Sequence, residues 1–210
     1  MVHRAWYIAG VVQEARTESR RHMTLAEWAE LPEEEPGELV AGWLEEEEVP
    51  DYVHELAVAW LIHALYAWVG PRGGLVAGSD AKFAVRGQQG RKPDLSMYFA
   101  DSPKPPRRGL VRTPPDVAVE VISPKPRDVR RDRVEKLDDY ATFGVRFYWI
   151  LDPEIRSLEI YELGSDGRYV HALGASAGKI PIPGCADLEL DLDSLWAQID
   201  RLPTEGSSDA

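Results

Sequence analysis

The chain has 210 residues, of which 44% are hydrophobic, and this length suits one globular domain with a substantial core. Its net charge of −12 argues against a protein that coats nucleic acid with a generally basic surface. Residues 104–136 differ from the rest, with ten Lys or Arg against five Asp or Glu, so an enzyme with a local basic surface is compatible with this composition. The single cysteine, Cys185, excludes an intramolecular disulfide and a zinc cluster made of cysteines.

Neither membrane insertion nor secretion is expected from the sequence. No apolar run has the length that a bilayer-spanning segment requires. Residues 5–12 are apolar and follow a basic start, but Gln13, Glu14 and Arg16 come next without a small-residue cleavage site. Together with the lone cysteine, these features favour a soluble cytoplasmic protein with no membrane partner.

The first expected element is a short helix that begins after Met23. Thr24 suits the N-cap position, and Glu27 three residues later completes a capping box. Residues 1–22 carry many charges with weak periodicity, so we expect an extension outside the core. A single domain would then cover residues 23–200, and residues 201–210 would form a disordered tail.

Between the first helix and residue 115, strands surround one long helix. Residues 52–69 are apolar on nearly all helical faces, which predicts deep burial, and Gly70 with Pro71 ends this helix. A hairpin around a glycine turn is expected over residues 38–45, and strands are expected over 75–85 and 95–99. A loop rich in Pro and Arg follows over residues 101–115.

The second half of the chain predicts a central strand, a helix and further strands. Residues 116–122 form a nearly continuous apolar run, typical of a strand that is covered on both faces. Residues 128–143 have helical spacing and stop at Gly144, a suitable C′ residue. Further strands are expected at 146–151, 157–163, 169–173 and 188–192. This order predicts an α/β fold of mixed α+β type, with a mixed central sheet flanked by helices and extra C-terminal strands.

Two carboxylates stand out against this pattern. Glu120 lies within the apolar strand, where burial is costly without a partner or a metal; a salt-bridged core Glu is the alternative. Asp94 follows Pro93 at the start of another strand, and alone it would suggest a turn. Adjacent strands lie about 5 Å apart, so the two carboxylates would repel each other unless they shared a cation or a proton. Mg²⁺ prefers such oxygen ligands and can position a water for attack on a phosphate.

Four further residues are weaker candidates. Lys136 shares a helix face with Tyr140 and could point toward the sheet, where its charge would orient the attacking water or stabilise the phosphate. The alternatives are a surface lysine and a core tyrosine. Glu38 lies in an apolar stretch and could either join the acidic site or face solvent. His54 opens the long helix, where a packing or capping role is more common than a ligand role.

In the order of these motifs the chain resembles the Uma2 family of restriction-endonuclease-like proteins. The resemblance extends from about Met23 to Trp196, almost the whole chain. It rests on residues 37–40 with Gly42, His54, residues 92–95, residues 115–124, residues 131–137, Tyr140, residues 144–145 and residues 148–153.

The resemblance implies a restriction-endonuclease-like core of the PD-(D/E)XK type with one acidic metal site. Asp94 would match the aspartate of that motif, Glu120 its second acidic residue, and Glu38 an acidic residue from the N-terminal part. The sequence departs from the pattern at Ile122, where the motif has lysine; Lys136 on the helix would then supply the missing cation.

The sequence therefore favours a Mg²⁺-dependent endonuclease acting on DNA, with Mn²⁺ as a second usable metal. Asp94 and Glu120 would bind the metal, and a homodimer is expected because cutting both strands takes two sites. A non-catalytic binding or scaffold protein on the same fold is the alternative, which the acidic net charge and Ile122 favour. A glycosidase built on the carboxylate pair fits less well, since that chemistry needs neither the lysine nor the basic stretch.

Overall fold

The computed structural model describes residues 21–32, 37–45, 49–123 and 130–203, and the structural statements below concern these ranges. Its helices are α1 (Leu25–Ala29), α2 (Tyr52–Val69), the 3₁₀-helix η1 (Gly70–Arg72), the π-helical turn η2 (Arg131–Glu135), α4 (Lys136–Phe143) and α5 (Leu192–Ile199). Its strands are β1 (Glu38–Val40), β2 (Trp43–Glu45), β3 (Leu75–Ala77), β4 (Phe83–Arg86), β5 (Gln89–Arg91), β6 (Leu95–Tyr98), β7 (Val117–Val121), β8 (Phe147–Asp152), β9 (Ser157–Leu163), β10 (Tyr169–Ala175), β11 (Lys179–Pro181) and β12 (Glu189–Asp191).

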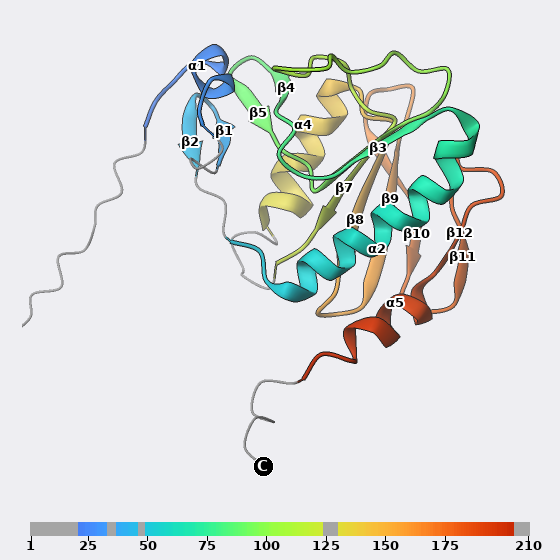
Figure 1. Cartoon of the computed structure of the whole chain (residues 1–210). Coiled ribbons are helices and arrows are strands. Elements are labelled where there is room, and N and C mark those ends of the chain that lie inside the picture. The colour runs from blue at the N-terminus through green and yellow to red at the C-terminus, as the bar shows by residue number, and fades with distance from the viewer. Residues whose placement is uncertain (1–20, 33–36, 46–48, 124–129, 204–210) are drawn as a thin grey trace, which may run out of the picture.

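A six-stranded mixed sheet forms the centre of the molecule, in the order β10-β9-β8-β7-β6-β3 (Figure 1). Strands β7 and β8 pair in parallel, and every other pair in this sheet is antiparallel. All five residues of β7 are buried, which confirms the prediction of a central strand that is covered on both faces.

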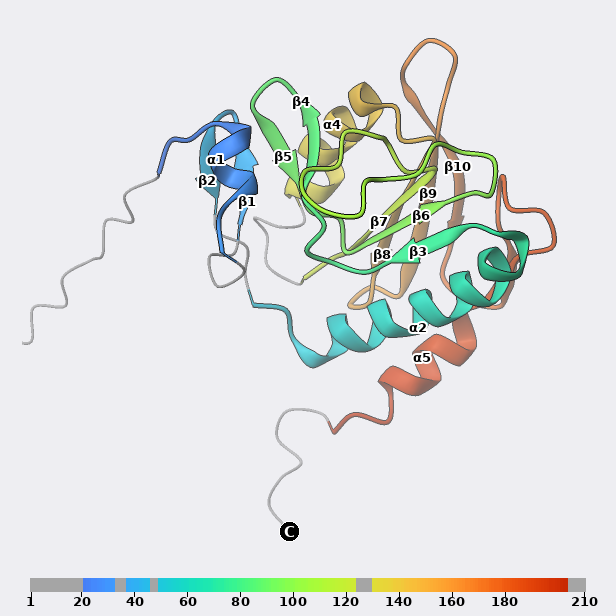
Figure 2. The ribbon, with the colours of Figure 1, turned by 45° about the horizontal axis from the view of Figure 1, so that its top comes forward.

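Helices cover both faces of this sheet, and the alternation along β7 decides which side chains each helix meets. Figure 2 shows α2 and α5 together on one side of the sheet and α4 on the other. Val117, Val119 and Val121 pack in the cluster that includes α2 and α5. Ala118 packs with Tyr140 of α4 on the opposite side. Since Glu120 has the same parity as Ala118, it faces α4.

A second, antiparallel sheet of four strands lies beside α4, in the order β2-β1-β5-β4. The expected hairpin at residues 38–45 is present as β1 and β2. The prediction of one strand over residues 75–85 was wrong, because β3 and β4 belong to different sheets and Asp80 between them has a positive φ of 76°. Strand β5 was not predicted. Its Gly90 packs directly against the indole of Trp28, where a Cβ would lie 2.4 Å from a ring carbon.

Helix α2 has the predicted bounds but is buried on one side only. Leu61, Leu65 and Val69 pack against the sheet, whereas Tyr52 and Tyr66 are mostly exposed, so the prediction of burial on nearly all faces was wrong. By length and hydropathy alone, the helix over residues 52–72 could cross a membrane, contrary to the expectation from sequence. A helix that packs in the core of a globular domain meets the same criterion, and the buried face of α2 has this role here.

The remaining elements differ from the predictions mainly at the ends. Residues 128–129 of the expected helix lie outside the described ranges; the described helix begins with a π-helical turn and ends at Gly144, whose positive φ of 92° confirms the predicted C′ position. The prediction of a strand over 188–192 was too long, because Asp191 caps α5 and Leu192 is already helical. Strand β11 and helix α5 were not predicted.

The two chain ends are described only in part. Residues 1–20 of the expected extension and residues 204–210 of the expected tail lie outside the described ranges. Arg21 and His22 are described, and both contact β2: the Leu44 amide donates to the Arg21 carbonyl, and His22 pairs with Trp43. The predicted capping box of α1 between Thr24 and Glu27 is present.

Candidate active site

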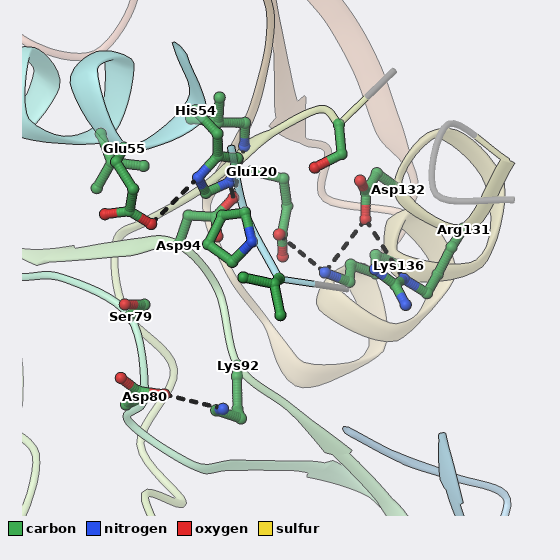
Figure 3. A pocket seen from close by; sticks show the side chains of 15 residues that line it. His54, Glu55, Ser79, Asp80, Lys92, Asp94, Glu120, Arg131, Asp132 and Lys136 are labelled. Atoms are coloured by element: carbon green, nitrogen blue, oxygen red, sulfur yellow. Dashed lines mark hydrogen bonds and ion pairs between the residues drawn. The ribbon is translucent and has the colours of Figure 1, made fainter. Parts of the chain in front are cut away.

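The start of β6 and the end of β7 meet in a pocket of about 420 Å³ (Figure 3). Leu95 pairs with Val119 in the antiparallel register, so the next step of that register brings Asp94 opposite Glu120. The beginning of α2, the π-helical turn η2 and the loop residues Ser79 and Asp80 also line the pocket. Asp94, Glu120 and Lys136, which come from three separate elements, all line it.

Asp94 is held by the neighbouring strand and by α2. Its Oδ2 accepts a hydrogen bond of 2.7 Å from the Val121 amide and lies 3.2 Å from His54 Nε2. Within the described ranges, its Oδ1 has no hydrogen-bond or ion-pair partner. This oxygen can therefore bind a cation without losing an internal contact.

Glu120 is almost completely buried and has a partner on each oxygen. Tyr140 donates its hydroxyl to Oε1 at 2.7 Å, and Lys136 Nζ lies 2.8 Å from Oε2. Burial raises the pKa of Glu120 well above its ordinary value, and although Lys136 opposes this rise, the charge of Asp94 adds to it. Additional positive charge in the pocket would therefore stabilise the ionised form of Glu120.

Lys136 points into the protein and not to the surface. Only 2% of the residue is exposed, and its ammonium lies 2.8 Å from Glu120, 3.1 Å from Asp132 and 3.5 Å from Glu38. Burial alone would lower the pKa of Lys136, but these carboxylates outweigh burial and raise it well above its ordinary value. The lysine is therefore a fixed positive charge beside the carboxylates of the pocket.

Glu38 supports the site from behind the pocket and is not among its lining residues. It is fully buried, and it accepts hydrogen bonds of 2.8 Å from Arg91 and 2.9 Å from the Lys92 amide. Burial favours its neutral form, but the charges of Lys136, Arg91 and Arg131 prevail and lower the pKa of Glu38 to about 2. The structure thus places Glu38 in the core, and the alternative of a solvent-facing Glu38 was wrong.

His54 and Tyr140 each contact one of the two central carboxylates. The His54 backbone amide donates to the Asp51 cap, and its imidazole contacts Asp94, so the residue combines a capping position with a contact to the site. Burial opposes the charge on His54, yet the hydrogen bond to Asp94 and its charge raise the pKa of His54. Tyr140 is a buried core tyrosine whose hydroxyl also reaches the site.

The structure adds two charged residues that the sequence analysis did not single out. Asp132 is buried at the pocket wall beside Lys136. Its spacing of four residues before Lys136 on one helix was a usable signal. Arg91 is fully buried and joins Glu38 to Asp139 of α4, with Nε 2.8 Å from Asp139 Oδ2. A short polar strand gave no sequence signal for such a residue.

The chemistry of these groups suits a hard divalent cation. The described residues contain no cluster of three or more His, Cys, Asp or Glu side chains arranged to hold a metal. Mg²⁺, however, is commonly bound by one or two carboxylates together with waters and substrate phosphates. Asp94, with its available Oδ1, and the desolvated Glu120 provide that minimal pair, so the residues present fit the metal that the sequence implied.

The architecture and the acidic pocket together define a restriction-endonuclease-like protein. The family model Uma2, described as "putative restriction endonuclease", matches residues 24–193, so the chain belongs to the Uma2 family. The solved structures that match include a "putative nuclease belonging to DUF820" from Anabaena variabilis, 19% identical, with a TM-score of 0.67; the match covers 83% of this chain and 98% of that chain. A comparison with curated proteins gave no match.

Proposed function

We propose that this protein is a Mg²⁺-dependent endonuclease that hydrolyses phosphodiester bonds of DNA, with Mn²⁺ as a usable substitute. The observation that carries the proposal is the position of Lys136 Nζ, 2.8 Å from Glu120 Oε2. The strand motif has Ile122 where the PD-(D/E)XK pattern has lysine. Lys136 of α4 places its ammonium next to Glu120, the carboxylate of the same motif. The acidic pair and its cation are therefore assembled from different elements.

Each residue has a distinct part in this proposal. Asp94 and Glu120 would hold the metal, which supplies a Lewis acid and an activated water when bound. Lys136 orients the water and stabilises negative charge as the water oxygen bonds to phosphorus and the P–O bond to the leaving group breaks. His54 and Tyr140 hold the two carboxylates in place. The attacking water releases one proton to solvent that enters the pocket, and the leaving oxygen takes a proton from the same solvent.

The proposal includes the substrate and the assembly. DNA is favoured by the restriction-endonuclease-like family and by the local excess of basic residues over 104–136. A homodimer is proposed because double-strand cleavage takes two sites, and light scattering with and without DNA tests it. A cytoplasmic location is also part of the proposal, and the free Cys185 is compatible with it.

Cleavage of plasmid and single-stranded DNA with Mg²⁺ or Mn²⁺ tests the proposal. The purified protein should cleave in the presence of metal, and Glu120→Ala should abolish cleavage while the protein stays folded. Glu162→Ala is a matched control, because Glu162 is a half-exposed residue of β9 and lies outside the pocket lining. Equal cleavage by both variants would assign the activity to a contaminant.

A non-catalytic DNA-binding or scaffold protein on this fold remains the second candidate. One observation favours it: both oxygens of Glu120 already have internal partners, as in a purely structural network. That candidate predicts DNA binding that is unaffected by metal and by Glu120→Ala, with no cleavage under any condition.

A further inference from the structure

The carboxylate of Asp132 has no part in the proposed function so far, yet it lies in the same pocket. The residue is 4% exposed and lines the pocket beside Lys136 (Figure 3). Burial raises the pKa of Asp132, although Lys136 and Arg131 oppose the rise. Burying a carboxylate costs free energy unless the group is well paired, so its presence here suggests a functional role.

The backbone around Asp132 is fixed in an uncommon conformation. Residues 131–135 form a π-helical turn, in which the Lys136 amide donates to the Arg131 carbonyl five residues earlier. The Asp132 carbonyl accepts a hydrogen bond of 2.9 Å from the hydroxyl of Tyr148 on β8. Such turns within helices occur frequently at functional sites. The turn and the tyrosine together anchor Asp132 against the central sheet.

Asp132 and Glu120 share the single ammonium of Lys136. The distances are 3.1 Å to Asp132 Oδ1 and 2.8 Å to Glu120 Oε2, and Figure 3 shows the ammonium between the two carboxylates. Within the described ranges, the ion-pair partners of Asp132 Oδ1 are Lys136 Nζ at 3.1 Å and Arg131 Nε at 3.8 Å, so Lys136 is its nearest cation. Asp132 thus acts chiefly on Lys136, the nearer of its two cationic neighbours on this helix.

This sharing matters when Glu120 engages a cation. With a divalent ion bound at Glu120, this carboxylate would hold Lys136 less strongly, because its charge would be offset and the ammonium would be repelled. Glu38 is a weaker substitute, because it lies 3.5 Å from the ammonium and is committed to Arg91 and the Lys92 amide. The second carboxylate at 3.1 Å then remains to hold the lysine at the pocket wall.

We propose that Asp132 is a positioning residue that keeps the Lys136 ammonium directed at the pocket while Glu120 binds the metal. The proposal rests on the proposed nuclease function. Asp132 acts through Lys136, touching neither the metal nor the scissile phosphate. It therefore affects the rate of the chemical step more than the binding of metal or DNA.

A double-mutant cycle between Asp132→Asn and Lys136→Met tests this proposal. Asp132→Asn should lower kcat by about 10- to 100-fold, the usual cost of losing a supporting partner, with KM unchanged within about twofold. In the Lys136→Met background the same change should have no further effect. Calorimetric titration should give the same Mn²⁺ Kd for wild type and Asp132→Asn within about threefold.

Two controls keep the result interpretable. Asp132→Glu retains the charge and should restore part of kcat, which gives an answer even if Lys136→Met does not fold. Asp138→Asn removes an exposed carboxylate of α4 that pairs with Arg86 of β4, and it should leave kcat unchanged.

Three results would overturn the inference: an unchanged kcat in Asp132→Asn, an equal loss in both backgrounds, or a tenfold weaker Mn²⁺ affinity, which would make Asp132 a metal ligand. Absence of cleavage by the unaltered protein would instead refute the proposed function, and the inference with it.

Discussion

Glu38 should make a large, pH-dependent contribution to stability. Its pKa is lowered from 4.5 to about 2 in the folded protein, which corresponds to about 3 kcal/mol at about 1.4 kcal/mol for each pKa unit. Because the folded pKa is below the unfolded one, this stabilisation is complete above about pH 4.5 and disappears as the pH falls through about 2. Its source is the ion pairing with Arg91 and Lys136 in a fully buried setting.

Urea unfolding of wild type and Glu38→Gln at several pH values measures this contribution. The difference between their unfolding free energies should be largest near neutral pH and should shrink by about 3 kcal/mol between pH 5 and pH 2. Comparison with the variant cancels the other carboxylates that titrate in this range. A difference that stays constant across these pH values would refute the argument that Glu38 is ionised and paired in the core.

Three further predictions concern neighbouring contacts. Tyr140→Phe removes the 2.7 Å hydrogen bond to Glu120 and should lower the unfolding free energy by about 1.5–3 kcal/mol, measured by urea denaturation; a change below about 0.5 kcal/mol would contradict the assigned bond. Gly90→Ala would place a methyl group 2.4 Å from the Trp28 ring, and thermal melts should show a loss of about 1–3 kcal/mol; wild-type stability would show that this contact is not tight. His54→Ala should weaken Mn²⁺ binding about tenfold in calorimetry, and an unchanged Kd would remove His54 from the support of the site.

The central part of the fold could be predicted from sequence because its signals are local and strong. The nearly continuous apolar run around Val119 is typical of a buried strand, and Gly144 marked the helix end because glycine readily adopts the positive φ found there. Glu120 stood out because a carboxylate is costly to bury within an otherwise apolar strand. The same run, read with a period of two, also determines that Glu120 faces α4.

The sequence could not determine how the second sheet completes the site. Strand β5 consists of Gln89, Gly90 and Arg91, none of which favours a strand, and its pairing depends on contacts with distant residues. The burial of Arg91 and Glu38 follows only from that tertiary packing. The apolar composition of α2 suggested burial on nearly all faces. The helix is buried on one side only, because the number of elements that pack against a helix determines how many of its faces are covered.

The helix residues of the site fall between these two cases. Lys136 and Asp132 have the spacing of one helical turn, which the sequence shows. The π-helical turn that contains Asp132 is not encoded in any pattern of residue types. The missing lysine at Ile122 was visible in the sequence. That Lys136 lies close enough to replace it could be seen only from the structure, in the 2.8 Å contact between Lys136 Nζ and Glu120 Oε2.

The most direct test of the central claim is the binding of a divalent cation to Asp94 and Glu120. The melting temperature of the wild type should rise with Mn²⁺ concentration, corresponding to about 2.7 kcal/mol at one hundred times the Kd. Asp94→Asn, which keeps the size of the side chain but removes the charge beside the available oxygen, should abolish this rise. An equal rise in both proteins, or none in the wild type at millimolar Mn²⁺, would contradict a metal site at these two carboxylates.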